Sequence, residues 1–413
     1  MSMVHSVSLR WFCVLMLWGI CAVEGGDWPQ ILGPHRNGTA EGEKLAEKWP
    51  SAGPKVVWER PVGSGFAGIA VAEGKAVVFH REGNDELIEA HQAATGERLW
   101  KVSTKTTYVP SISEDDGPLC VPTIAEGIVV CFGAAGRLTA VELASGEQLW
   151  SRTLAQEYGA PSGYFGAGSS PVVYGGKVFV NLGADRKSAG LIAVDLKTGK
   201  TIWNKTKEQA SYASPIVTEI EGEVTLIFIT RLNVLGVAPE DGRVLWEFPF
   251  GKRGPTVNAA APVIDGTRLY VTASYGIGGV YAELSKDGAK EIWADEMPFA
   301  AQYTTPVPAE GAWYGIDGRK DIGRGTLRCV SLEERKEYWS ETEFGVGHLI
   351  AADGKLVILK DEGELLLVRA DSKKFSPVSE FQIDDGTTRA IPALANGLLY
   401  VRGSTKVRSY DLR

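Results

Sequence analysis

Cysteine and histidine are scarce in this chain, with five of each among 413 residues. Two of the cysteines lie in the N-terminal segment, which leaves Cys120, Cys131 and Cys329 for the rest of the chain. An odd number fits no disulfide framework, and a bridge between Cys120 and Cys131 would need a register shift between neighbouring strands. We therefore expect three buried free thiols.

Long apolar runs are also missing. The run from Trp11 to Val23 is too short to span a bilayer, which takes about 20 residues, and no later run approaches that length. Its position predicts a signal peptide over residues 1–26 and hence a secreted or periplasmic protein without a transmembrane segment. Lipid anchoring at Cys21 is the less favoured alternative, because the residues before it fit such a site poorly.

The chain lacks an excess of basic charge. It has 51 Asp and Glu against 43 Lys and Arg, a formal net charge of −8. Nucleic acid is therefore not expected as a partner, because binding it requires neutralisation of phosphates. Helix signals are nearly absent, whereas glycine is abundant with 49 residues. Together these features favour an all-β protein with many turns.

What the chain has instead is a repeated unit, best seen in residues 169–203. Four short runs rich in Val and Ile are separated by glycine turns, which predicts four antiparallel strands. A tryptophan closes the unit, and this residue recurs at intervals from 42 residues (Trp58 to Trp100) to 53 (Trp150 to Trp203). The start of the unit occurs eight times, so we predict an eight-bladed β-propeller over residues 55–413.

The two ends of the repeat array complete each other. The segment Lys55–Val62 is a single tryptophan-bearing strand with no unit before it, and the last unit, residues 388–412, has only three strands. We predict that the N-terminal strand is the outer strand of the last blade, which removes exposed sheet edges. Residues 27–54 lack strand alternation and are expected to form an arm over the propeller, anchored by Trp28 and Trp49.

One face of the predicted propeller carries the longer loops and the mouth of the central channel. The residues just before the first strand of each blade are expected at the rim of this mouth. Several of them are aromatic or basic, which suits a planar or anionic ligand. The alternative is that these side chains only fill the channel. The candidate binding residues are Phe66, Tyr212, Asn258, Tyr303, His348 and Arg389 at the mouth, with Arg186 and Arg319 in adjacent loops.

No catalytic or metal-ligating motif is complete. His80 and His91 fall on neighbouring strands without a carboxylate set at zinc-ligand spacing. Asp361, Glu362 and Glu364 form an acidic turn, for which solvation is favoured over calcium binding. We therefore predict no catalytic residue, no metal and no cofactor.

The repeat resembles a known family. The pattern Ser169-x-Pro171-Val172 through Thr198-Gly199 to Trp203 resembles the pyrroloquinoline-quinone-type (PQQ-like) propeller repeat, and Trp28-Pro29-Gln30 resembles the leader of secreted propellers in planctomycete-type bacteria. The resemblance implies an eight-bladed fold and two branches. One comprises quinone-dependent dehydrogenases, which hold the quinone over calcium, and the other comprises outer-membrane-assembly propeller lipoproteins, which are non-catalytic scaffolds. The size and the closure resemble the second branch more.

We interpret the chain as a secreted or periplasmic, non-catalytic binding or scaffold propeller, monomeric, with a protein or a glycan as partner on the loop-rich face. Two enzymatic alternatives remain open. The first is an oxidoreductase that depends on PQQ with calcium or acts on sugars. The second is a polysaccharide hydrolase or lyase, which would need carboxylates facing each other across the mouth, with Asp116, Asp185 and Asp317 as candidates.

Overall fold

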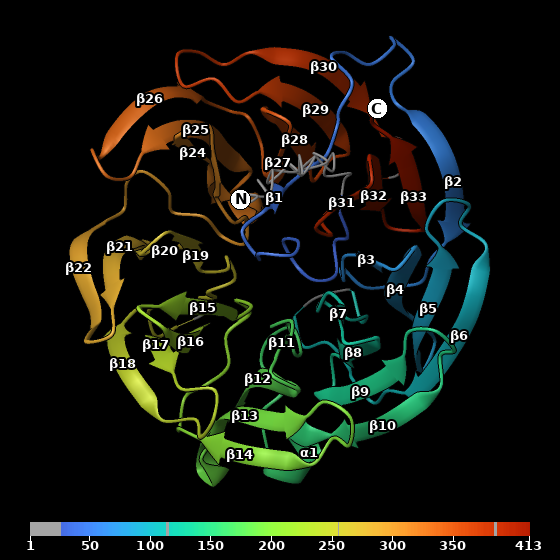
Figure 1. The fold of residues 1–413 in the computed structure, drawn as a ribbon, viewed down its shortest axis with the longest axis vertical. Coiled ribbons are helices and arrows are strands. Elements are labelled where there is room, and N and C mark those ends of the chain that lie inside the picture. Colours follow the sequence, from blue (N-terminus) through green and yellow to red (C-terminus); the bar gives the residue numbers. More distant parts are fainter. Residues whose placement is uncertain (1–25, 113–114, 255, 384–385) are drawn as a thin grey trace, which may run out of the picture.

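The computed structural model describes residues 26–112, 115–254, 256–383 and 386–413, so the predicted signal peptide lies outside the described residues except for Gly26. Eight antiparallel sheets of four strands stand around a central axis as the blades of a propeller (Figure 1). The predicted fold is therefore confirmed. In blades 1 to 7 the strands follow chain order from the axis outward, because short turns join each strand to its neighbour.

The first four blades, in chain order, have these strands: β3 (Ala70–Ala72), β4 (Lys75–Glu82), β5 (Asp85–Gln92) and β6 (Arg98–Lys105) in blade 1; β7 (Thr123–Ala125), β8 (Ile128–Phe132), β9 (Arg137–Glu142) and β10 (Gln148–Thr153) in blade 2; β11 (Val172–Tyr174), β12 (Lys177–Ala184), β13 (Ala189–Asp195) and β14 (Thr201–Lys205) in blade 3; β15 (Ile216–Ile220), β16 (Glu223–Ile229), β17 (Asn233–Val237) and β18 (Val244–Pro249) in blade 4.

The other four blades have these strands: β19 (Val263–Asp265), β20 (Arg268–Ala273), β21 (Gly278–Ser285) and β22 (Gly288–Asp295) in blade 5; β23 (Val307–Ala309), β24 (Ala312–Arg319), β25 (Arg324–Ser331) and β26 (Lys336–Glu341) in blade 6; β27 (Gly347–Ala352), β28 (Lys355–Lys360), β29 (Glu364–Arg369) and β30 (Pro377–Gln382) in blade 7; β31 (Ala393–Ala395), β32 (Leu398–Arg402), β33 (Lys406–Asp411) and β2 (Lys55–Pro61) in blade 8. Helical structure among the described residues is limited to α1 (Leu154–Tyr158) and the 3-10 turns η1 (Asp185–Lys187) and η2 (Lys320–Ile322). None of it is long and apolar enough to cross a membrane.

Blade 8 closes the ring as predicted. Strand β2 pairs antiparallel with β33, in a register that runs from Lys55 opposite Asp411 to Pro61 opposite Lys406. The strand ends at Pro61, but the next residue, Val62, still donates its N–H to the carbonyl of Thr405 at 2.9 Å. The first and last blades are thus held together by main-chain hydrogen bonds between the two ends of the chain.

The closing tryptophans dock each blade onto the next one. In six blades the indole N–H donates at 2.8 to 3.0 Å to a carbonyl in or next to the turn between the third and fourth strands of the following blade. In blade 3, for example, Trp203 donates to Pro239. Blade 7 has Phe381 instead, and this ring packs on Gly53, which lies in the arm of residues 27–54. The recurrent tryptophan is therefore an inter-blade contact.

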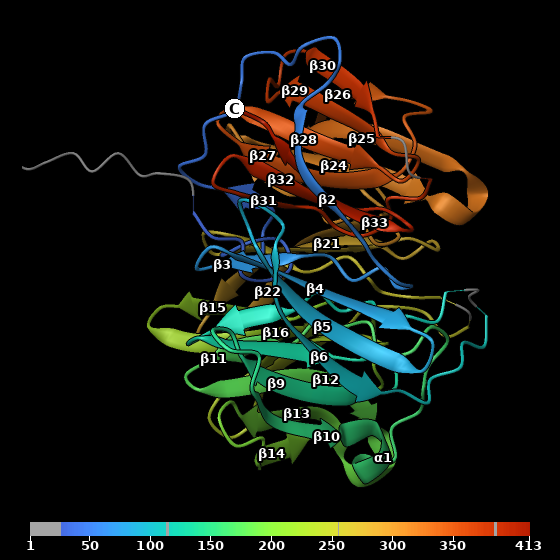
Figure 2. The same cartoon turned by 90° about the vertical axis from the view of Figure 1, so that its right-hand side faces the viewer.

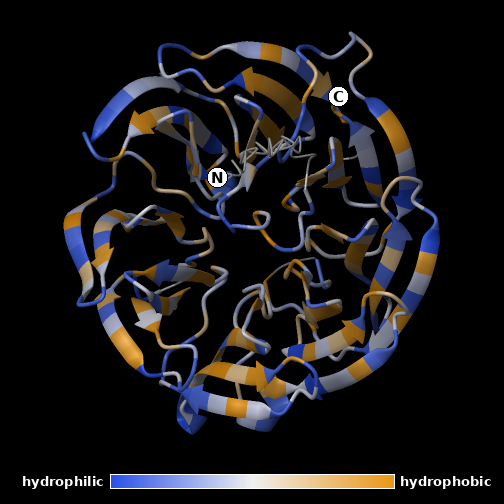
Figure 3. Ribbon diagram, in the orientation of Figure 1, coloured by the Kyte–Doolittle hydropathy of each residue, from blue (hydrophilic) through white to orange (hydrophobic). Residues whose placement is uncertain are grey.

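The core lies between the blades. Strands β4 and β5 are buried along almost their whole length, because both of their faces pack on neighbouring sheets. The outer strands alternate between half-buried and exposed residues, as in β6, and Figure 3 shows a matching alternation of apolar and polar residues along the rim of the ring. The free thiols expected at Cys120, Cys131 and Cys329 are confirmed, and all three are buried.

The arm lies across the turn face, which we define as the face with the short turns between first and second strands (Figure 2). Trp28 exchanges two main-chain hydrogen bonds of 2.8 Å with Val71, and Trp49 is buried against blade 7. The short strand β1 (Thr39–Ala40) adds parallel to β27. Arg36 reaches into the axis, where its guanidinium donates to the carbonyls of Pro171 and Pro215. The arm therefore closes the axis at this face.

Candidate functional site

The opposite, loop-rich face carries the loops between second and third strands and the loops that enter each blade (Figure 2). At its centre the axis holds a cavity of about 200 Å³. Five of the eight predicted binding residues line this cavity: Phe66, Tyr212, Tyr303, His348 and Arg389. They converge because four of them stand four residues before the innermost strand of their blade, and His348 is the second residue of β27.

Arg389 dominates the axial cavity. Its guanidinium carbon lies 5.3 Å from the ring centre of Phe66 and 5.0 Å from that of Tyr303, so the positive charge is held between two aromatic faces. His348 packs against Tyr303, with 5.7 Å between ring centres, and its Nε2 lies 3.1 Å from the carbonyl of Arg389. Burial lowers the pKa of His348 and favours the neutral ring.

The three other predicted residues do not line the axial cavity. Asn258 is buried and its amide donates to the carbonyls of Thr230 and Arg231, so it braces the loop that enters blade 5. Arg186 is exposed in η1. Arg319 lies at the rim, where its guanidinium carbon is 4.1 Å from the ring centre of Tyr275, a residue that does line the cavity.

Asp361 is a buried part of this site that sequence reasoning placed wrongly on a solvated turn. Its side chain is 4% exposed, and its Oδ2 accepts hydrogen bonds from Tyr303 and from Lys320, the latter at 2.8 Å. The burial of Tyr303 and the adjacent carboxylate raise the pKa of the phenol. Three acidic residues among four positions suggested a surface turn, and nothing in the local sequence signals a partner from blade 6.

The histidine pair in blade 1 has one carboxylate between its rings and, in the described part of the chain, no metal-ligand set. Glu89 lies between the two rings, with 3.9 Å from its Oε1 to Nε2 of His80 and 3.3 Å from its Oε2 to Nε2 of His91. A carboxylate therefore does accompany the pair. Nζ of Lys101 and Nη1 of Arg98 each lie 3.4 Å from Oε1 of Glu89. The carboxylate is therefore already paired with positive charges. Across the described residues, no group of three or more His, Cys, Asp or Glu side chains is arranged to hold a metal ion.

The axial site does not fit a quinone held over calcium. The guanidinium of Arg389 lies between Phe66 and Tyr303 in this cavity, and its charge would repel a divalent cation. Asp361 offers only its Oδ1, because its Oδ2 is bonded to Tyr303 and Lys320, and a single carboxylate oxygen is too few for calcium. No step of a quinone-dependent reaction is therefore derived for this chain.

The carboxylates considered for polysaccharide cleavage are held by neighbours in the same or an adjacent loop or strand. Asp116 lies 3.4 Å from Arg81, Asp185 accepts the N–H of Arg186, and Asp317 lies 3.0 Å from Arg328. Asp116, Asp185 and Asp317 lie near blades 1, 3 and 6, respectively. Each carboxylate thus has a local structural partner.

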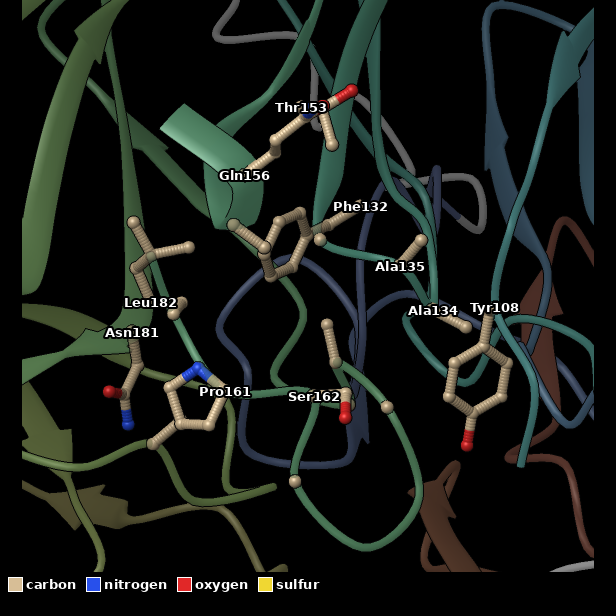
Figure 4. Close-up of a pocket in the computed structure, with 18 of the residues that line it drawn as sticks. Tyr108, Phe132, Ala134, Ala135, Thr153, Gln156, Pro161, Ser162, Asn181 and Leu182 are labelled. Atoms are coloured by element: carbon tan, nitrogen blue, oxygen red, sulfur yellow. The ribbon is translucent and has the colours of Figure 1, made fainter. Parts of the chain in front are cut away.

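A hollow larger than the axial cavity lies between blades 2 and 3, a region that sequence reasoning did not single out. It encloses about 580 Å³ next to α1 and the loop of residues 160–168. Figure 4 shows Phe132 and Ser162 facing the middle of this hollow, with Tyr108 on one side and Asn181 and Leu182 on the other. The signal that could have drawn attention to it is the length of the glycine-containing segment between the outer strand of blade 2 and the first strand of blade 3.

Comparison with known proteins gives one family and a wide set of similar folds. The model of the family described as outer membrane protein assembly factor BamB matches residues 40–160 and 84–341, which together span well over half of the chain. The outer membrane protein assembly factor BamB of Burkholderia pseudomallei (strain K96243) is 22% identical over 275 residues, which are 56% of this chain and 69% of that protein.

Solved structures with the same fold include a BamB protein and dehydrogenases. BamB from Moraxella catarrhalis superposes with a TM-score of 0.64 at 13% identity, covering 87% of this chain and 99% of that one. A europium-containing methanol dehydrogenase gives 0.67 at 12% identity, covering 91% of this chain and 89% of that one. The quinohemoprotein alcohol dehydrogenase ADHIIG from Pseudomonas putida HK5 gives 0.66 at 11% identity, with 94% and 80% covered. At these identities the structural likeness shows the fold alone.

Proposed function

Because the chain belongs to the family of outer membrane protein assembly factor BamB, we propose that it is a non-catalytic propeller that binds another protein through its loop-rich face. One observation carries the choice of face. The four most exposed large apolar side chains among the described residues all lie in loops of that face: Val109 at 80%, Ile112 at 61%, Ile322 at 56% and Met297 at 46%. Apolar groups that remain in water on one side of a protein are typical of a surface that a partner covers.

The axial cavity has a structural role in this proposal. Arg389, held between Phe66 and Tyr303, narrows the mouth on the loop-rich face, and Arg36 of the arm closes the axis from the turn face. The cavity that remains is only about 200 Å³, so the loops are the main surface available to a partner. The relatives named as assembly factors support a protein as that partner.

Site-directed photo-crosslinking tests the proposal. A benzoylphenylalanine in place of Val109 should give one discrete protein adduct in cells of the source organism. The same group in place of Tyr174, which is 40% exposed on the turn face, should give none. Val109→Asp together with Ile112→Asp should abolish an adduct formed at position 322, because charges on the surface oppose apolar contact. Equal labelling of both faces would overturn the proposal.

Activity measurements test the enzymatic alternative. The purified chain is titrated with pyrroloquinoline quinone and calcium, followed by tryptophan fluorescence, and then assayed for dye reduction with alcohols and sugars. We expect no saturable quenching at micromolar quinone, a level that corresponds to about −8 kcal/mol. Saturable binding with dye reduction would replace the scaffold by an oxidoreductase.

The location and assembly state are part of the same proposal. We infer a secreted or periplasmic monomer whose residues 1–26 are removed. N-terminal sequencing of the envelope form should begin at or near Asp27, and sedimentation equilibrium should give a single monomer mass. A lipid-modified Cys21 at the mature N-terminus would instead assign a membrane anchor.

A further inference from the structure

We propose that the hollow between blades 2 and 3 is a pocket for an uncharged segment of peptide that carries an aromatic side chain. The inference rests on the proposed function, since it states which part of a protein partner this face holds. The enclosed volume of about 580 Å³ lies within the range of known ligand pockets, roughly 300–1,000 Å³. It has room for one large side chain and the main chain on both sides of it.

The chemistry of the walls selects against charge. None of the side chains that line the hollow is ionic; they are small apolar groups, aromatic rings, hydroxyls and amides. A charged group that entered would lose its hydration without meeting an opposite charge. The apolar part of the wall comes from Phe132 of β8 and Leu182 of β12, which face the hollow from neighbouring blades (Figure 4). An aromatic ring between them would bury apolar surface on both sides.

One buried hydroxyl in the wall lacks a partner. Tyr108 is 6% exposed and lines the hollow, and its Oη makes no hydrogen bond to any described residue. Its ring lies against Gly166, where a Cβ would come within 3.1 Å, so the ring is held in place. A buried hydroxyl without a partner is costly, and a ligand group in the hollow would satisfy it.

Further uncommitted polar groups surround the hollow. Within the described part of the chain, the side chains of Thr153, Gln156 and Ser162 form no hydrogen bond, and all three line it. Tyr212 accepts the N–H groups of Tyr164 and Phe165 at 3.1 and 3.0 Å, which leaves its own hydrogen free to donate. These donors and acceptors match the amide groups of a peptide main chain, which both donate and accept.

The rim favours a peptide over a neutral glycan. Val109 lines the hollow and is the most exposed large apolar side chain among the described residues, and Ile112 lies three residues further along the same loop. An apolar rim stabilises the neighbouring side chains of a peptide, whereas a sugar would place hydroxyl groups against it. The site therefore combines an apolar rim, an uncharged interior and the unsatisfied hydroxyl of Tyr108 in one place.

Fluorescence polarisation with the full-length mature protein tests the pocket. The probe is fluorescein-labelled Gly-Ser-Tyr-Ser-Gly amide, compared with the same peptide carrying Lys or Glu in place of Tyr. We expect the Tyr peptide to bind at least tenfold more tightly than either charged peptide. Ser162→Trp, a change on an exposed loop that fills the hollow, should weaken binding by about tenfold or more.

Tyr108→Phe separates a ligand-binding role from a structural one. Loss of a hydrogen bond to the peptide should weaken its binding about fivefold, while the melting temperature stays the same or rises, because the unpartnered hydroxyl is gone. Tyr174→Phe on the turn face is the matched control and should change neither quantity. If Ser162→Trp and Tyr108→Phe leave peptide binding intact, the pocket inference is overturned.

The outcomes distinguish this inference from the function beneath it. A protein adduct at position 109 without any peptide binding overturns the pocket and leaves the protein-binding face standing. The reverse result is peptide binding that Ser162→Trp blocks, with no protein adduct at position 109. It supports the pocket and contradicts the proposal that the loop-rich face binds a protein in the cell. Binding of chitotetraose that Ser162→Trp abolishes would reassign the pocket to a glycan.

Discussion

Buried guanidinium groups tie together parts of this chain that are distant in sequence. Arg36 in the arm donates to the carbonyl of Pro215 at 2.6 Å and to that of Pro171, and its Nε donates to Gln30 at 2.7 Å. Burial lowers its pKa to about 9, so its charge is held at a cost that the carbonyls offset. We predict that Arg36→Met destabilises the fold by about 3 kcal/mol in urea unfolding, because buried carbonyls lose their donors.

The control for this prediction is a guanidinium that faces water. Arg243→Met removes an exposed side chain and should change the free energy of unfolding by less than about 0.5 kcal/mol. The free energy of unfolding of Arg36→Lys should lie between those of the two methionine variants. One ammonium group cannot reach both carbonyls as the planar guanidinium does. If Arg36→Met is as stable as Arg243→Met, the hydrogen bonds of Arg36 do not stabilise the arm against the axis.

A buried histidine makes folding sensitive to mild acid. The ring of His80 accepts the N–H of Gly63 at 3.0 Å, and burial lowers its pKa to about 4 from 6.5. The unfolded chain takes up this proton below about pH 6.5, whereas the folded protein does not until about pH 4, so stability falls across this range as the pH drops. From pH 7 to pH 5 the loss from His80 should be about 2 kcal/mol.

The variant His80→Asn keeps an acceptor for Gly63 and cannot titrate, so its urea midpoint should depend less on pH between 7 and 5. His348, whose pKa is also lowered, adds a smaller loss of the same sign and remains in the variant. Exposed His35→Asn is the control and should follow the parent chain. The lowered pKa of Glu89, about 2, affects stability only below about pH 4.5 and lies outside this window. An unchanged slope in His80→Asn would refute the assignment.

At the scale of elements, the tryptophans that close blades 8, 1, 2 and 3 each pack closely on a glycine of the next blade. A Cβ on Gly199 would lie 2.6 Å from the ring of Trp150, whereas a Cβ on Gly176 would meet nothing within 4 Å. The two glycines have nearly the same φ, +68° and +69°, so alanine pays the same backbone strain at both. We predict that Gly176→Ala costs about 1 kcal/mol and Gly199→Ala at least about 2 kcal/mol more, in urea unfolding. Equal losses would show that the indole shifts freely and that docking is not tight.

The elements that sequence analysis could predict are those with a period. Glycine turns and closing tryptophans repeat along the chain, so the repeat alone predicts eight blades and the closure by β2. The same register brought Phe66, Tyr303 and Arg389 to one cavity, since each stands at an equivalent place in its blade.

Contacts without a period could not be predicted in this way. Arg36 bonds to Pro215 across 179 residues, and Asp361 meets Tyr303 across 58. The pocket proposed between blades 2 and 3 arises where the chain departs from the repeat, in the irregular loop of residues 160–168. In a repeat protein the period determines the scaffold, and irregular insertions determine most of what is specific to one chain.

At the scale of the whole molecule, closure by β2 should decide whether the protein is the monomer that we propose. A chain that begins at residue 55 loses the arm and Arg36 but keeps all eight blades complete. We expect it to remain a monomer with a lower melting temperature.

A chain that begins at residue 63 also loses β2, which exposes the hydrogen-bonding edge of β33 from Lys406 to Asp411. An exposed strand edge pairs with other chains, so we expect dimers and larger aggregates in analytical ultracentrifugation. A synthetic peptide of residues 54–63, added during refolding, should restore the monomer because it supplies the missing strand. If the chain from residue 63 is monomeric and as stable as the chain from residue 55, the ring is held by inter-blade packing alone and the closing strand is dispensable.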